Sequence, residues 1–367
     1  LSGATEPQRA GGSLMGAPEQ RQATPPPAVG PGGVMGRFGA AYANPADAYA
    51  GVPILNPPLW HDDVAVYFFC GGISSGAFVI GALADLSGER WRPLAQTAYV
   101  VAFAAMLPCP PLLIKDLGRP ERFHHMLRIF KPSSPMNFGV WTLLAHSGFA
   151  TLQTARALAD WGVLPAAIAR LLPARPLAVA GLPAALALGG YTGVLLGTTS
   201  VPVWSRSPLL GGLFMASAIA SGAAAVSLAS TLTGRDTPAE HAALAAIGLA
   251  AGATELALTG GYLDTTGEVA GPLRSGPHGA LLHGALAGTA LALALETAGL
   301  RSRSHKRQAL LGALAAGAAL AGGAMLRLAV VRAGHDSAVN REDNLAAMQQ
   351  TARNPGWGPP RGRGGGV

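Results

Sequence analysis

The residues best suited to chemistry gather in one polar stretch between two long apolar runs. Residues 115–131 carry five basic side chains, two acidic side chains and two adjacent histidines. Gly118 and Pro120 argue against one continuous helix here, because glycine loosens the backbone and proline removes a hydrogen-bond donor. We therefore expect a loop that does more than connect its neighbours. A solvated loop in contact with lipid headgroups is the alternative interpretation.

A second group of polar side chains suits the carbonyl oxygens of a lipophilic ring. Tyr191 supplies a phenol, His61 an imidazole and Asn56 a carboxamide, near the ends of two apolar runs. A quinone needs hydrogen-bond donors at its two oxygens, an apolar slot for its ring and tail, and a source of protons. Tyr191 together with Trp60 and Trp204 fits equally well with simple anchoring at a membrane interface. The residues alone leave these two interpretations open.

Ionisable side chains inside the apolar runs form a third group, because such residues are costly in a bilayer and are usually paired or functional. Glu255 lies near the middle of its run, and we expect it to carry protons or to make a structural hydrogen bond. Glu296 and Arg327 lie toward the ends of theirs, where they could extend to the interface. His146 and His283 are more typical of hydrogen-bonded core histidines than of haem ligands, since nothing in their spacing pairs them.

The composition is that of a bilayer protein. Of 367 residues, 50% are hydrophobic and 12% are charged, against about 25% charged in an average soluble domain. The formal charge of +7 is scattered over loops and tails, which disfavours nucleic-acid binding. Neither of the two cysteines fits a ligand pattern, so we expect no iron–sulfur cluster, structural zinc or disulfide framework. Motifs for nucleotide binding and nucleophilic catalysis are also missing, so we assign no catalytic residue.

Eight apolar segments have the length needed to place these groups in a bilayer. A hydrocarbon core of about 30 Å needs about 20 helical residues. The runs are continuous and do not alternate with period two, which favours helix over sheet. The sequence therefore predicts an all-α integral membrane protein with about eight transmembrane helices in a bundle. The predicted spans are 64–86, 94–114, 138–159, 177–200, 208–231, 241–263, 278–299 and 308–331.

An even number of spans predicts a simple topology. Both ends of the transmembrane domain should lie on one side, together with connections 115–137, 201–207 and 264–277. Lys and Arg counts near the spans do not separate the two sides clearly enough for the positive-inside rule, so the orientation stays open. A short interfacial helix is expected at 165–172 on the other side.

The domain organisation follows from the same change in composition. We assign the transmembrane domain to residues 51–335 and predict disordered, Gly/Pro-rich tails at 1–50 and 336–367, the first of which could also lie on a partner. Residues 1–60 contain no continuous apolar core of the kind found in a cleavable signal peptide. Within the fourth span, Gly189, Gly193 and Gly197 form a stripe that is more typical of close helix packing than of a ligand groove.

Several motifs, in order along the chain, resemble the NrfD/polysulfide reductase family of membrane subunits. They are YFFCGGISSGA at 67–77, DLGRP at 116–120, SPMNFGVW at 134–141, YTGVLL at 191–196 and SAIASG at 217–222. The resemblance covers residues 57–334 and leaves both tails outside. It implies a metal-free, multi-pass subunit of a respiratory oxidoreductase in the bacterial cytoplasmic membrane. It also implies that the chemistry of the primary substrate is carried out by partner subunits.

The resemblance further implies partners, a cofactor and site residues. The partners would be a ferredoxin-like iron–sulfur subunit, with or without a molybdopterin catalytic subunit, and the lipid bilayer. The exchangeable cofactor would be menaquinone or ubiquinone, with no haem in this chain. By motif position, His61 and Tyr191 resemble the quinone-site residues of the family, and Asn56 is a looser match. The residues that resemble the surface meeting the iron–sulfur partner are Asp116, Arg119, Glu121, Arg122 and His124.

Two other functions remain as alternatives to quinone exchange with Glu255 on a proton path. One is a purely structural membrane anchor without quinone chemistry, which would bind its partner but show no quinone activity. The other is a proton-coupled transporter that uses Glu255 and Arg327. Transporters with inverted repeats usually show paired interrupted helices in matching halves, and this sequence shows no such pair. The primary substrate and the direction of electron flow are not fixed by these residues.

Overall fold

The computed structural model describes a continuous bundle with short gaps and leaves out both tails. The described residues are 55, 58, 60, 62–131, 133–235, 237–340 and 344. All of them belong to the unit Pro53–Val367. Asn56 and His61 lie outside the described residues, and so do the predicted tail 1–50 and most of 336–367, whose assignments stay predictions.

Within these residues the secondary structure is helical, with no strand. The α-helices are α1 Asp62–Leu86, α2 Arg92–Met106, α3 Cys109–Asp116, α4 Pro135–Asp160, α5 Ala166–Leu171, α6 Ala174–Gly197, α7 Pro202–Ser205, α8 Leu210–Thr233, α9 Pro238–Thr266, α10 Gly271–Arg274, α11 Gly276–Leu300 and α12 His305–Val339. Short 3₁₀ helices are η4 Glu89–Trp91, η5 Pro120–Leu127 and η6 Gly267–Ala270.

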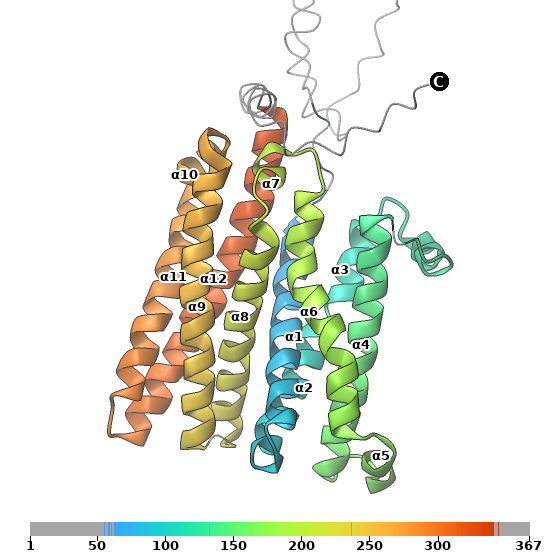
Figure 1. Cartoon of the computed structure of the whole chain (residues 1–367), viewed down its shortest axis with the longest axis vertical. Coiled ribbons are helices and arrows are strands. Elements are labelled where there is room, and N and C mark those ends of the chain that lie inside the picture. The colour runs from blue at the N-terminus through green and yellow to red at the C-terminus, as the bar shows by residue number, and fades with distance from the viewer. Residues whose placement is uncertain are drawn as a thin grey trace, which may run out of the picture. The chain divides into compact units, whose positions relative to one another are not determined.

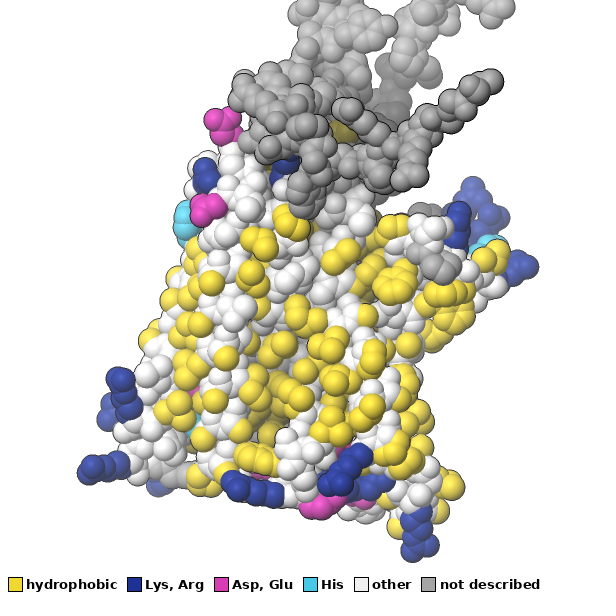
Figure 2. Space-filling view, viewed as in Figure 1, with side chains coloured by type: hydrophobic (Ala, Val, Ile, Leu, Met, Phe, Trp, Pro, Cys, Tyr) yellow, Lys and Arg dark blue, Asp and Glu magenta, His cyan; other side chains and the backbone are white. Residues whose placement is uncertain are grey.

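Seven helical stretches of the described residues are long and apolar enough to cross a membrane: Asp62–Leu86, Glu89–Asp116, Ala174–Gly197, Leu210–Thr233, Pro238–Arg274, Gly276–Leu300 and Lys306–Val339. Helix α4 has the length of a span, but polar residues such as His146, Gln153 and Arg156 interrupt its apolar sequence. Between the two ends of the bundle the surface is largely hydrophobic or uncharged, and charged side chains gather at the ends (Figure 2). The all-α membrane bundle is confirmed, and the count of eight spans is approximate.

Helices α1 and α8 are the centre of the bundle. Helix α1 packs against α2, α6, α8 and α12, while α8 packs against α1, α6, α9 and α12 (Figure 1). Their crossing is close because small residues face each other there. A Cβ at Gly76 of α1 would overlap the carbonyl oxygen of Ala218 on α8. The contact between α6 and α8 is equally close, because a Cβ at Gly193 of α6 would overlap the carbonyl oxygen of Leu210. The packing interpretation of the glycine stripe in α6 is therefore confirmed.

The connections divide between the two ends of the bundle as the sequence predicts. One end, which we call the loop end, holds the start of α1, the connection between α3 and α4, helices α7 and α10, and the end of α12 (Figure 1). The opposite end, the far end, holds α5 at the place where a short helix was expected. Among the described residues, Tyr191 lies near the loop end of α6, and the charged residues predicted to bind a partner lie at the end of α3 or in the connection between α3 and α4.

Candidate functional site

Tyr191 lies in the last turns of α6 and faces the first turn of α4. Its side chain is buried, and its hydroxyl donates a hydrogen bond to the backbone carbonyl of Pro135. Its ring lies 5.8 Å from the ring of Phe138, centroid to centroid. A Cβ at Gly139 would overlap the phenol ring, so only glycine leaves room for it. Two motifs far apart in the sequence, SPMNFGVW and YTGVLL, therefore meet at this phenol.

A second phenol lies near Tyr191, with a thiol close to it. Tyr67 of α1 is buried, and Tyr191 and Cys109 both lie in its neighbourhood. Gly71, one turn along α1, faces both groups: a Cβ there would lie 3.7 Å from the Tyr67 ring and 3.9 Å from the Cys109 sulfur. The sequence analysis missed Tyr67 and Cys109. The available signal was the position of Tyr67 at the head of the first family motif.

The carboxamide of Asn137 fixes the connection between α3 and α4. Its NH₂ group donates to the carbonyls of Met126 (3.2 Å) and Ile129 (2.9 Å), and its oxygen accepts from the backbone N–H of Lys131 (2.6 Å). Ser134 caps α4 by accepting from the N–H of Asn137 at 3.4 Å. The backbone is therefore folded back onto the first turn of α4, so that its charged residues keep a defined position at the loop end.

The predicted partner-binding residues all lie on this connection or at its start. Asp116, at the end of α3, is half-buried, whereas the others are exposed. The structure thus places them on one surface at the same end as Tyr191. The four exposed residues are Arg119, Glu121, Arg122 and His124.

The other two predicted quinone ligands, Asn56 and His61, are not among the described residues, but the neighbours of His61 are. Trp60 stacks on Trp204, with ring centroids 5.6 Å apart and planes inclined by 22°. Asp62 accepts two hydrogen bonds, at 2.8 and 2.6 Å, from the guanidinium group of an arginine near the end of α12. These contacts hold the start of α1 at the loop end, the end at which Tyr191 lies.

Helix α7 is buried in the loop end. The Trp204 side chain is fully buried, and its indole N–H donates to the carbonyl of Val330 at 2.7 Å. The Tyr262 hydroxyl donates to the carbonyl of Val203 at 2.8 Å, and the Val203 N–H donates to the Ser337 hydroxyl at 3.3 Å. The interpretation of Trp204 as an interfacial anchor is therefore wrong, because its polar group is satisfied by backbone inside the bundle.

Arg327 lies deep in the bundle. It is 1% exposed, and its guanidinium donates to the Ser217 hydroxyl and, at 3.0 Å, to the carbonyl of Phe214 on α8. The guanidinium carbon lies 4.6 Å from the centroid of the Phe214 ring, a cation–π geometry. A Cβ at Gly72 would lie 3.3 Å from one of its nitrogens. The expectation that Arg327 extends to the interface is wrong: it is a buried cation with partners on α8.

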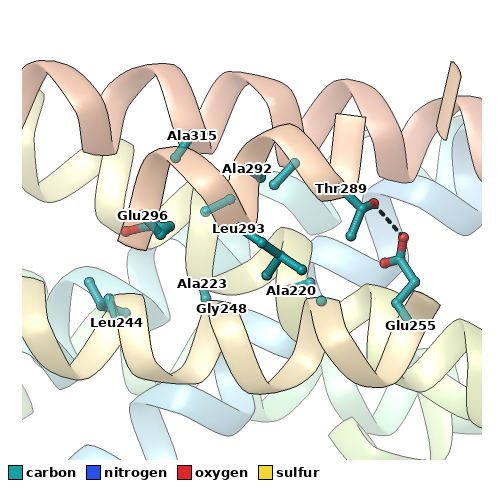
Figure 3. Close-up of a pocket in the computed structure, with 13 residues that line it drawn as sticks. Ala220, Ala223, Leu244, Gly248, Glu255, Thr289, Ala292, Leu293, Glu296 and Ala315 are labelled. Atoms are coloured by element: carbon teal, nitrogen blue, oxygen red, sulfur yellow. Dashed lines mark hydrogen bonds between the residues drawn. The ribbon is translucent and has the colours of Figure 1, made fainter. Parts of the chain in front are cut away.

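Glu255 is the buried anion in the same half of the bundle. Its carboxylate accepts a hydrogen bond from the Thr289 hydroxyl on α11 at 2.8 Å (Figure 3). It also interacts electrostatically with Arg327. This is the structural hydrogen bond that the sequence analysis allowed for. The role of Glu255 in carrying protons stays a prediction.

A small cavity connects Glu255 with Glu296. It lies between α8, α9, α11 and α12, and the two carboxylates stand at its opposite ends (Figure 3). About 20 Å³ is open to the centre of a water molecule, enough for about one ordered water. One Glu296 carboxylate oxygen is buried with no hydrogen-bond partner among the described residues. This glutamate lies near the far end, four residues before the last residue of α11.

The two intramembrane histidines have unrelated environments. His146 is buried on α4 and its Nε2 lies 2.8 Å from the Ser74 hydroxyl. Because Ser74 donates its own proton to the carbonyl of Ala102 at 2.7 Å, the imidazole N–H must be the donor to Ser74. His283 is exposed on α11. His146 is thus the hydrogen-bonded core histidine expected, that expectation is wrong for His283, and the structure does not bring the two together.

A polar cluster closes the far end of the α1, α2, α4 and α6 half. Asp160, the last residue of α4, accepts hydrogen bonds from Arg92 (2.8 Å) and Gln96 (2.9 Å). Burial opposes ionisation of this carboxyl, but the two hydrogen bonds together with the charges of Arg92 and Arg156 outweigh it and hold the pKa of Asp160 below its usual value. Nearby, the Tyr99 hydroxyl donates to Asp85 at 3.0 Å. The cluster ties α2 to α4 and α1 at this end.

Comparison with known protein families decides the identity of this bundle. The family model described as "Polysulphide reductase, NrfD" matches residues 53–337. The chain belongs to the NrfD family. Three relatives illustrate the match. A polysulfide reductase polypeptide of Wolinella succinogenes is 30% identical over 179 residues, which span 46% of this chain and 56% of the relative. Protein NrfD of Escherichia coli is 28% identical over 199 residues, 49% of this chain and 62% of the relative.

The third relative is named as part of a different reductase. A selenate reductase subunit of Mesobacillus selenatarsenatis is 23% identical over 197 residues, 45% of this chain and 46% of the relative. This NrfD chain therefore spans between about half and two thirds of the length of these relatives. The family resemblance read from the five motifs is confirmed, and the chain is a multi-pass membrane protein of this family.

Proposed function

We propose that this NrfD chain anchors a respiratory oxidoreductase in the bacterial cytoplasmic membrane and exchanges electrons with the quinone pool. The observation that supports this best is the meeting of buried phenols and a charged loop at one end of the bundle. Tyr191 and Tyr67 offer hydroxyl groups among apolar walls, and the neighbouring loop offers a surface for a redox partner. The relatives named as parts of polysulfide and selenate reductases support the same role.

The residues at the loop end suit a quinone headgroup. A bound menaquinone or ubiquinone would supply two-electron, two-proton redox chemistry. Tyr191 would turn its hydroxyl from the Pro135 carbonyl to one quinone oxygen, which exchanges one hydrogen bond for another at a net cost of about 1 kcal/mol or less. His61 and Asn56, assigned by the family resemblance, would serve the other oxygen. The ring would lie beside Phe138 and Gly139.

The charged loop would receive the electron-transfer partner. Asp116, Arg119, Glu121, Arg122 and His124 would form the polar surface that meets a ferredoxin-like iron–sulfur subunit, and the primary substrate would bind to a molybdopterin subunit behind it. Charged surfaces of this kind set the orientation and the rate of association more than the affinity. Asn137 would keep this surface at a fixed distance from Tyr191, because its three hydrogen bonds hold the loop.

Glu255 would carry protons between the quinone site and the far end of the bundle. Its carboxylate, the cavity and Glu296 form a polar series that leads toward the far end of the bundle. One water in the cavity would bridge part of this distance. Replacing Glu255 with glutamine would keep the Thr289 hydrogen bond but remove the titrating group. We expect quinone-dependent proton uptake from the far side to fall, while electron transfer to an artificial acceptor stays unchanged.

The assignment of Tyr191 can be tested in the assembled complex by quinone reduction or quinol oxidation. We expect Tyr191→Phe and His61→Ala to lower this activity at least tenfold. Tyr262→Phe is the matched control, because it also removes a buried phenol from the loop end but one bonded to α7. Co-purification of the partner subunits shows that each variant still assembles. Full quinone activity in the assembled Tyr191→Phe and His61→Ala complexes would refute the site.

A purely structural anchor is the second candidate, because the Tyr191 hydroxyl already has a backbone partner in Pro135. This function requires partner binding alone. It predicts that the assembled complex binds no quinone and transfers electrons only to soluble acceptors. Quinone binding that is lost in Tyr191→Phe would argue against it.

A further inference from the structure

The connection between α3 and α4 extends beside the bundle. Its residues 117–131 and 133–134, which we call the lateral loop, project sideways from the loop end of α4 (Figure 1). The main contacts of η5, which forms the middle of this loop, are with α3 and α4. A segment in this position borders the surrounding membrane as well as the polar end of the bundle.

One side of the lateral loop is apolar. Phe123 in η5 is 39% exposed, and Ile129 and Phe130 after it are 70% and 56% exposed. In a 3₁₀ helix, residues three apart share one side, which puts Phe123 and Met126 in one row. Large hydrophobic side chains gathered this way seldom face water without a partner. Lipid or another protein is therefore needed to cover this surface.

The apolar surface continues onto α4. Met136 and Phe138, in the first turn of α4, are 53% and 41% exposed, and Leu144 further along is also exposed. The Phe130 ring meets the Trp141 ring edge-on at 5.8 Å. The apolar side of the loop thus joins the outer wall of a long bundle helix. That wall has the hydrophobic character of a lipid-facing surface.

The other side of the loop is basic. Residues 119–131 contain four Lys or Arg side chains and one acidic side chain, Glu121, a net charge of +3 with histidines neutral. All four basic residues are exposed. Lys and Arg side chains gather on the upper and outer margin of this projection, and hydrophobic side chains lie below them, on the side of the apolar wall (Figure 2). The basic residues are Arg119, Arg122, Arg128 and Lys131.

We propose that the lateral loop is an interfacial anchor that binds anionic phospholipids. Its apolar row lies at the boundary between headgroups and acyl chains, as the apolar face of an amphipathic segment does. Arg128 and Lys131, the two basic side chains outside the proposed partner surface, reach up to the lipid phosphates, each contributing an attraction that depends on anionic lipid. The hydrogen bonds of Asn137 hold the loop at this depth. The proposal does not depend on quinone chemistry.

The depth of the loop can be measured in the full-length protein in lipid nanodiscs. Phe130→Cys and Arg122→Cys would each be labelled with an environment-sensitive fluorophore, and the unsubstituted protein, with Cys70 and Cys109, sets the background. We expect the label at position 130 to be quenched by spin-labelled lipid and shielded from aqueous iodide. The label at position 122 should show the reverse. Equal access of iodide to both labels would overturn the proposal.

A protein partner is the competing occupant of the apolar side. If the label at position 130 is open to iodide in nanodiscs and becomes shielded only in the complex with co-purified subunits, the surface is a subunit interface and the proposal is wrong. Shielding in the isolated protein that depends on lipid supports it. The same preparation thus separates lipid from protein without any measurement of quinone activity.

The headgroup part of the proposal has its own test. The double variant Arg128→Gln/Lys131→Gln removes two exposed cations from the lateral loop and leaves the proposed partner surface unchanged. Its control removes two exposed cations from the far end. In nanodiscs that contain phosphatidylglycerol and phosphatidylcholine, we expect the loop variant to retain several-fold less phosphatidylglycerol through purification, by mass spectrometry of bound lipid. Equal retention by both variants would overturn binding of anionic headgroups. The control variant is Arg301→Gln/Arg303→Gln.

Discussion

Arg327 offers a test of how α12 is held against α8. Arg327→Met keeps most of the apolar stem but removes two charge-assisted hydrogen bonds to α8 and the cation–π contact with Phe214. Such hydrogen bonds contribute about 1.5–3 kcal/mol each. The change also removes a positive charge that acts on the buried Glu255, although no direct ion pair joins these two described side chains. We expect a loss of about 3–5 kcal/mol of unfolding free energy.

Thermal unfolding of the purified protein in mild detergent measures this loss. At roughly 2–4 °C per kcal/mol, a loss of about 3–5 kcal/mol should lower the midpoint by roughly 6–20 °C. Arg332→Met is the control, since that arginine is on the same helix but its ion pair with Asp62 is largely exposed and should contribute about 0–1 kcal/mol. A drop for Arg327→Met no larger than for Arg332→Met would refute the reasoning.

A double-mutant cycle tests the electrostatic part of the argument separately. Glu255→Gln keeps an acceptor for Thr289 and removes the negative charge. If Arg327 and Glu255 stabilise each other, Arg327→Met/Glu255→Gln should be less destabilised than the sum of the single variants by about 0.5–3 kcal/mol. Additive single effects would show that the two charges are independent.

Three further predictions concern packing, the loop and pH. Gly139→Ala should displace the Tyr191 ring and lower quinone activity as Tyr191→Phe does, whereas Gly148→Ala, where a Cβ meets open space, should not; equal activities would contradict the packing argument. Asn137→Ala should speed tryptic cleavage of the lateral loop several-fold, and unchanged cleavage would show that its hydrogen bonds do not hold the loop. Because the folded-state pKa of Asp160 is depressed, its stabilisation is present above its unfolded pKa of about 3.9 and is lost as the pH falls below that. The unfolding midpoint of Asp160→Asn should therefore lack this acid-dependent decrease, and an unchanged pH profile would contradict it.

The positions of the long helices, and the end of the bundle at which each connection lies, were predictable because both follow from the lengths of the hydrophobic runs. Span positions, the shared end of the connections and the burial of Tyr191 followed from that length and from motif position. The glycine stripe in α6 was also predictable as packing, since small residues at four-residue intervals always lie on one helix face.

Long-range contacts were not predictable from the sequence. Arg327 stands near the end of the predicted span 308–331, but α12 continues to Val339, so the arginine is well inside the helix. Trp204 is interpreted from the sequence as an interfacial residue because the residues around it do not indicate that α7 folds into the bundle. From the sequence alone the lateral loop is recognisable only as a charged segment. Its apolar side could not be predicted, because the arrangement of its apolar side chains depends on the hydrogen bonds of Asn137.

The central place of α1 bears on how this protein is made. Among the described helices α1 is synthesised first, and it packs against α8 and α12, whose residues are synthesised much later. Until α8 is inserted, the surface around Gly76 has only lipid to cover it. The bond between Asp62 and Arg332 joins residues 270 positions apart in the sequence, so the loop end closes only after the second half of α12 has been synthesised. Translation that stops after α6 therefore yields an unfinished fold, a target for membrane quality control rather than a smaller working unit.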